Sequence, residues 1–116
     1  MSFTNYEDIK VWQKSHQLVL KIYKITKFFP PEEQYGLTNQ IRRSAVSIGA
    51  NIVEGYKKTN KDFKRYLDIS RGSLEETKYH LQLSKDLGYC SFNDFEKLKS
   101  DIHDVGGMLY NLKMKL

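Results

Sequence analysis

Cysteine, proline and long apolar runs are all scarce in this chain of 116 residues. The scarcity of cysteine and the scarcity of long apolar runs each exclude a class of protein. Cys90 is the only cysteine, so no disulfide can form within the chain. No apolar run approaches the ~20 residues that a membrane-spanning helix needs, and residues 1–10 lack the charged and then apolar order of a signal peptide. Because the length suits one domain, we expect a single cytoplasmic domain, residues 1–116, with no membrane partner.

Acidic residues are scarce in one stretch of the sequence, between Arg42 and Arg71. This stretch contains eight basic and three acidic residues, and its excess of five positive charges equals the net charge of +5 of the whole chain. A localised positive field attracts polyanions better than a scattered one, although a solvated face that favours solubility explains the charge equally well. The eight candidate nucleic-acid-binding residues are Arg42, Arg43, Lys57, Lys58, Lys61, Lys64, Arg65 and Arg71.

Apolar residues recur at alternating steps of three and four along four segments, which is the pattern of amphipathic helices. The adjacent prolines Pro30 and Pro31 stop the first helix, because proline lacks the amide proton and restricts the residue before it. Short connections between helices favour antiparallel neighbours. The sequence therefore predicts an all-α, up-down-up-down four-helix bundle, with helices over about residues 6–28, 60–87 and 92–116, and a second helix that begins between residues 32 and 36 and ends near residue 56.

Capping residues indicate where the last two connections lie. Thr59 or Asn60 is a suitable N-cap for the third helix, and Ser91 with Asp94 resembles a capping box for the fourth. Gly88 is a plausible C-cap, and Gly55 could contribute to ending the second helix. Inside the third helix the small polar residues Ser70, Thr77 and Ser84 allow close approach of a neighbour, and their hydroxyls can bond back to the preceding turn.

Residues with catalytic or metal-binding chemistry do not gather in the sequence. His16, His80 and His103 fall on three different predicted helices, and only one Glu–His pair is four residues apart. Cys90 follows a helix end and has no cationic partner nearby in sequence, which favours a packed thiol over a nucleophile. No phosphate-loop motif occurs. We therefore expect no catalytic residue, no metal and no cofactor, and a protein that is not an enzyme.

Tyrosine is common, and two of its eight copies lie among the basic residues. Tyr56 is followed by Lys57 and Lys58, and Tyr66 follows Arg65. Aromatic rings interleaved with cations can stack nucleobases, whereas most tyrosines at helix contacts simply bridge core and water. Tyr56 and Tyr66 are thus the best candidates for a role in nucleic-acid binding.

Five stretches of the chain match one family pattern. They are residues 11–14 (VWQK), 29–37 (FPPEEQYGL), 40–48 (QIRRSAVSI), 51–55 (NIVEG) and 62–76 (DFxxYLxISRGSLxE). On these motifs, which are specific and span nearly the whole chain, the protein resembles the four-helix-bundle proteins encoded in intervening sequences of bacterial 23S ribosomal RNA genes. The resemblance extends more weakly to accessory proteins of diversity-generating retroelements.

This resemblance implies a left-handed up-down bundle that assembles as a homopentamer with a basic surface, in the bacterial cytoplasm. Nucleic-acid binding is the usual proposal for the family, whose biochemical role is not settled. The chain has Gly49 where the family pattern often has proline, and Ser44 and Val53 where it has alanine. Since glycine keeps the amide proton that proline lacks, we expect a straighter second helix here.

Polar residues at the end of the second helix suggest a structural network. Asn51 and Glu54 are three apart, next to the apolar stripe, and buried polar groups need partners. We expect hydrogen bonds that join Asn51, Glu54, Arg42 or Arg43, and Arg71, and that lock the second and third helices together.

Two functions remain open at this point. The first is a homo-oligomer that binds RNA or DNA through its basic residues, with salt-sensitive affinity. The alternative is an interaction scaffold or accessory subunit that docks a protein partner such as a reverse transcriptase.

Overall fold

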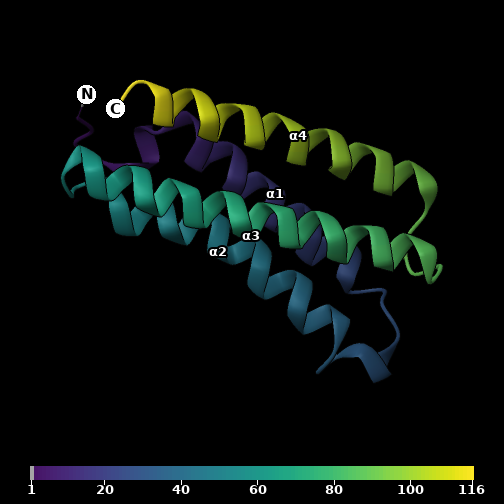
Figure 1. The fold of residues 1–116 in the computed structure, drawn as a ribbon. Helices are drawn as coiled ribbons and strands as arrows, with labels where there is room; N and C mark the ends of the chain where they lie inside the picture. The colour runs from purple at the N-terminus through teal and green to yellow at the C-terminus, as the bar shows by residue number, and fades with distance from the viewer. Residues whose placement is uncertain (1) are drawn as a thin grey trace.

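Four long helices pack antiparallel into a rod of 43 × 25 × 20 Å in a computed structural model that describes residues 2–116 (Figure 1). Each helix packs on its neighbours in sequence, and α1 also packs on α4, which closes the bundle. The predicted all-α, up-down-up-down arrangement is confirmed. The helices are α1 (Lys10–Thr26), α2 (Leu37–Gly55), α3 (Asn60–Asp86) and α4 (Phe92–Met114), and the 3₁₀ turns Tyr6–Asp8 and Pro31–Glu33 precede α1 and α2.

The apolar stripes of the helices meet in one core, as their spacing predicts. All seven stripe residues of α3 are buried, from Phe63 to Ser84, and so are six in α4, from Phe95 to Leu112. The stripe of α1 is buried except for Ile25, which is half-buried at the edge of the core. Burial of such side chains contributes about 1.5–3 kcal/mol each and is the main force that holds the four helices together.

The first helix begins four residues later than predicted. The Asn5 side chain accepts a hydrogen bond of 3.1 Å from the backbone N–H of Glu7 and caps a separate 3₁₀ turn. Ile9 then takes an extended conformation, with ψ at 115°, so its own backbone cannot continue a helix. This break lets the Ile9 side chain turn into the core, where it is buried.

A carboxylate joins the two connections at one end of the bundle. Glu33 Oε1 accepts a hydrogen bond from the N–H of Leu37, 3.1 Å away, and so caps the start of α2. Glu33 Oε2 accepts another from Tyr89 Oη, 2.9 Å away, in the α3–α4 connection. A Cβ atom at Gly36 would lie 2.6 Å from Glu33 Oε1, so glycine at this position leaves the space that the carboxylate needs.

The expected caps of α3 and α4 are confirmed. Gly88 has φ at +80°, and hydrogen bonds from Gly88 N to Lys85 O and from Tyr89 N to Ser84 O, both 2.9 Å, complete a Schellman motif. Thr59 Oγ1 and Ser91 Oγ each accept a hydrogen bond from the N–H of an aspartate three residues later, which satisfies a free donor at each helix start.

Hydroxyl groups line the contact between α2 and α3. Ser70 Oγ donates to the backbone oxygen of Ile48 at 2.7 Å, and Thr77 Oγ1 lies 2.8 Å from Ser44 Oγ. Thr77 and Ser84 also bond back to their own helix, as predicted, whereas Ser70 bonds across to α2 instead. Since buried polar groups need partners, these bonds fix how α2 and α3 pair.

Candidate nucleic-acid interface

Five of the eight candidate cations gather at the α2–α3 connection, at one end of the bundle (Figure 1, left). The connection is short because α2 ends at Gly55 and α3 begins at Asn60. We call this group the basic turn. It consists of Lys57, Lys58, Lys61 and Arg65, which are exposed, and Lys64, which is half-buried.

At Gly55, next to the basic turn, α3 packs closely against the backbone of α2. A Cβ atom at this position would lie 2.6 Å from Cβ of Tyr66, a distance that no real contact allows. Among the described glycines only Gly88 has positive φ, so Gly55 does not end α2 through a left-handed cap. The sequence correctly places Gly55 at the end of the helix, but its role is to let Tyr66 of α3 approach the α2 backbone.

Tyrosine rings contact three of the five cations of the basic turn. Tyr66 lies under both the Arg65 guanidinium, 4.7 Å from the ring centroid, and the Lys58 ammonium, at 5.7 Å. Lys57 lies 5.7 Å from the Tyr56 ring, which in turn packs edge-on against Tyr6. Such contacts contribute about 0.5–1 kcal/mol at exposed sites. In this structure the two tyrosines position the cations.

Within residues 2–116, none of the eight candidate residues forms an ion pair. Among residues 2–116, the lysines that form ion pairs are Lys14, Lys21, Lys85 and Lys113, and none of these belongs to the eight candidates. A cluster of unpaired cations raises the local positive potential and so favours an anionic partner.

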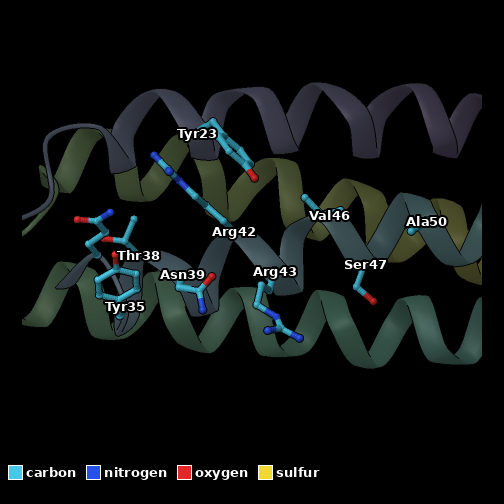
Figure 2. A pocket seen from close by; sticks show the side chains of 10 residues that line it. Tyr23, Tyr35, Thr38, Asn39, Arg42, Arg43, Val46, Ser47 and Ala50 are labelled. Carbon is cyan, nitrogen blue, oxygen red and sulfur yellow. The ribbon is translucent and has the colours of Figure 1, made fainter.

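Arg42 and Arg43 lie apart from the basic turn, on opposite flanks of α2 (Figure 2). Arg42 Nε donates to Thr26 Oγ1 at 2.8 Å, and its guanidinium stacks 4.5 Å from the Tyr23 ring, so it joins α2 to α1. Arg43 is exposed and lines a polar groove between α2 and α3 with Ser47 and Glu76. Both arginines also border a groove of about 690 Å³ that runs along α2.

Arg71 faces a third surface, a groove between α3 and α4. The eight candidates therefore do not form one continuous site. The groove adds two further cations, Lys78 of α3 and Lys99 of α4, which the sequence did not indicate because both lie outside the basic segment. The available signal was the series Lys99, His103 and Tyr110, at steps of four and seven beside a pair of glycines, which indicates one face of a helix.

The expected polar network around Glu54 does not form. Asn51 Nδ2 donates to Ser47 O and Ser47 Oγ, at 2.8 and 3.0 Å, within its own helix. Glu54 is exposed, and within residues 2–116 it makes neither a hydrogen bond nor an ion pair with Arg42, Arg43 or Arg71. The prediction was wrong for Glu54, because the helix turns this residue outward to solvent. Asn51 is linked to α3 through Ser47, whose Oγ accepts a hydrogen bond from Ser73 Oγ at 2.8 Å. The hydroxyl groups between α2 and α3 take the linking role instead.

Two groups of potential chemical interest have pKa values that favour their neutral forms. Burial lowers the pKa of His80, against the opposing charge of Glu76, and the ring Nδ1 lies 3.2 Å from Ser44 Oγ. Burial, together with the charge of Asp94, raises the pKa of the Cys90 thiol, so the reactive thiolate is scarce at neutral pH.

Residues 2–116 contain no cluster of three or more metal-ligating side chains. In the same range no helix is long and apolar enough to cross a bilayer.

Comparison with known proteins places these features in a family context. The sequence model described as 23S rRNA-intervening sequence protein matches residues 7–111. A crystal structure from Bacteroides thetaiotaomicron, described as a protein of unknown function from the S23 ribosomal protein family, is 28% identical. It superimposes with a TM-score of 0.81, over 89% of this chain and 97% of that one. No curated protein matches the sequence.

Proposed function

Because the chain belongs to the 23S rRNA-intervening sequence protein family, we propose that it is a homo-oligomeric protein that binds RNA or DNA through the basic turn. The observation that carries this proposal is the gathering of Lys57, Lys58, Lys61, Lys64 and Arg65 at one end of the bundle with no ion-pair partner in the described residues. Lysine and arginine that neutralise phosphates release counterions, and this release drives binding.

The proposed role is binding rather than catalysis, in the cytoplasm. The family resemblance favours a pentamer, and a ring would repeat the basic turn in each subunit, so that a long polyanion meets several turns at once. Such repetition raises the apparent affinity without any new contact. Contacts to phosphates carry no sequence information by themselves, so we expect weak sequence preference.

Neutralising the basic turn tests the proposal. The triple variant K57Q/K58Q/K61Q changes three exposed residues, so the fold should survive. We expect the dissociation constant for structured RNA or duplex DNA to rise about tenfold or more. We also expect the slope of log K against log salt concentration to become shallower, by up to about 0.9 per lost phosphate contact on duplex DNA. Fluorescence anisotropy at two salt concentrations measures both quantities.

A matched control removes the same charge elsewhere. Lys24, Lys27 and Lys97 are exposed and, within the described residues, form no ion pair. The variant K24Q/K27Q/K97Q should bind nearly as well as the wild type if position matters more than net charge. Equal losses in the two variants would show that the basic turn is only part of a general charge effect.

A scaffold role is the second candidate, and one feature favours it. At the end of the bundle opposite the basic turn, Phe28, Tyr35 and Phe92 are 84%, 88% and 70% exposed, beside the connections that Glu33 and Tyr89 join (Figure 1, right). These three side chains share one end of the bundle, and exposed apolar surface is typical of protein-interaction sites where it is contiguous. If nucleic-acid binding disappears near physiological salt, this end becomes the better candidate for function, with a protein partner such as a reverse transcriptase.

A further inference from the structure

A second cationic surface lies in the groove between α3 and α4, which has a volume of about 370 Å³. Its floor is apolar, because Leu74 and Ile102 are buried beneath it. Gly106 and Gly107 form part of its wall on α4, and a Cβ atom at Gly107 would meet nothing within 4 Å. The groove is thus open because α4 has no side chains at these two positions. Its volume is in the range of small ligand sites, about 300–1,000 Å³.

Positive side chains from both helices line this groove. Arg71 and Lys78 come from α3, and Lys99 comes from α4, while Glu75 is the acidic residue among the lining side chains. Within residues 2–116 none of the three cations forms an ion pair. Three positive charges against the single negative charge of Glu75 leave an excess of positive charge in the groove, and like charges repel one another, so an anion that entered the groove would relieve this repulsion.

An aromatic ring and an amide complete the lining. Tyr110 is 52% exposed, and Asn111 follows it on α4. Within the described residues Tyr110 makes no aromatic or cation–π contact, unlike Tyr56 and Tyr66. Unpaired nucleobases stack on rings of this kind and present their edges to side-chain amides.

The groove continues the basic turn along α3. Lys64, Arg71 and Lys78 are spaced by seven residues, which places them on one face of the helix at intervals of about 10 Å. Between the turn and the groove, Lys113 of α4 donates to Asp68 of α3 at 2.8 Å. This pair neutralises one of the two acidic residues on this face of α3, and the other, Glu75, lies between Arg71 and Lys78.

From these observations we infer that the α3–α4 groove binds a short single-stranded segment of nucleic acid. Arg71, Lys78 and Lys99 contact its phosphates, and Tyr110 stacks one unpaired base. The inference rests on the nucleic-acid binding proposed above and deepens it, because it adds a second contact surface and a preference for unpaired strands.

Charge removal in the groove is the first test. The probe is a fluorescein-labelled decauridylate, whose bases are unpaired, and the variant is R71Q/K78Q/K99Q. We expect a dissociation constant raised about tenfold or more, with K24Q/K27Q/K97Q as the control of equal charge. If the groove variant and the control bind equally while K57Q/K58Q/K61Q loses affinity, the inference is overturned and the proposed function stands. A wild type that binds neither decauridylate, structured RNA nor duplex DNA overturns both.

Filling the groove tests the geometry without any change of charge. Gly107→Leu adds a side chain on α4 at the border of the groove, and Gly72→Leu adds the same side chain on the exposed surface of α3; at both positions an added Cβ meets nothing within 4 Å. Both variants should stay folded, which circular dichroism checks. We expect Gly107→Leu alone to weaken binding of decauridylate, and equal affinities of the two variants would overturn the inference.

Stacking has its own matched pair of variants. Tyr110→Phe keeps the ring and should bind decauridylate as the wild type does, whereas Tyr110→Ala should lose about 1–3 kcal/mol, the usual contribution of one stacked base and equal to roughly 5- to 150-fold in affinity. An alanine variant that binds as well as the phenylalanine variant would remove Tyr110 from the site and overturn the inferred preference for unpaired bases.

Discussion

At the scale of single residues, Asp101 shows how one carboxylate can join two helices. It lies on α4, with one oxygen 2.8 Å from Lys21 Nζ and the other 3.4 Å from Lys14 Nζ, both on α1. Burial by itself would raise the pKa of Asp101, but the hydrogen bond and charge of Lys21 and the charge of Lys14 outweigh burial. The net result is a pKa below the ordinary value of a carboxyl group.

This lowered pKa links stability to pH. A carboxyl group with a lower pKa in the folded than in the unfolded state stabilises the fold fully above its unfolded pKa, about 3.9, and loses this contribution as pH falls through the folded pKa. Asp101→Asn should therefore lower the free energy of unfolding at pH 7 by about 0.5–1 kcal/mol, because both lysines are partly exposed and the pair is screened by water. Urea titrations at pH 7 and near pH 3 would show the difference from wild type shrinking in acid.

Asp104 provides the control on the same helix. It is exposed and, within the described residues, has no ion pair. Asp104→Asn should change stability much less than Asp101→Asn at pH 7. A loss in the Asp101 variant that is the same at both pH values would mean that packing, rather than charge, explains the effect.

The sequence predicted the types of the important residues better than their partners. Asn51 and Glu54 are polar and close to the apolar stripe, yet Asn51 bonds locally and Glu54 faces solvent. The position of a residue in a helix determines which face of the helix its side chain lies on. Its partners on other helices depend on how each helix is rotated about its axis and shifted along it relative to its neighbours. These follow only from the packed structure.

At the scale of elements, two helical glycines should respond in opposite ways to the same substitution. Gly55→Ala forces a methyl group against Tyr66 Cβ, so we expect a loss of about 1–3 kcal/mol in the free energy of unfolding. Gly107→Ala adds a methyl group in open space within α4, so we expect a gain of up to about 1 kcal/mol from helix propensity. Thermal or urea unfolding of both variants compares them, and two changes of the same sign would contradict the packing described for Gly55.

Periodicity predicted the buried faces of α3 and α4 well, because both helices bury one regular stripe and have clear caps. It placed the start of α1 too early. The Asn5 side chain accepts a hydrogen bond from the backbone of Glu7, which competes with helix formation there, and the spacing of apolar residues contains no information on such a bond. The basic turn follows directly from the sequence, because its cations are neighbours in the chain. The α3–α4 groove does not, since it needs two helices in register.

At the scale of the whole molecule, the two ends of the rod differ in chemistry. One end has the basic turn, and the other has exposed aromatic residues beside the Glu33–Tyr89 hydrogen bond. A ring of parallel subunits would concentrate the positive charge of every turn on one face.

This arrangement leads to a prediction about assembly. We expect the purified protein to have a mass five times that of the single chain, by light scattering coupled to size exclusion, as the family resemblance implies. A monomer at all concentrations would exclude the ring. An oligomer of another size would still repeat the basic turn, but with a number of subunits other than five.

Tyr6 of the N-terminal segment packs against Tyr56 at the start of the basic turn, with ring centroids 6.1 Å apart. Both chain ends lie at this end of the rod (Figure 1). A purification tag or fluorescent fusion at either terminus would therefore sit beside the basic turn. A polyhistidine tag would add partly protonated imidazole rings next to it, and an acidic fusion would act as a tethered competitor for it. Affinities measured on tagged protein would then report partly on the tag, so a label attached to the α3–α4 connection at the far end is the better choice.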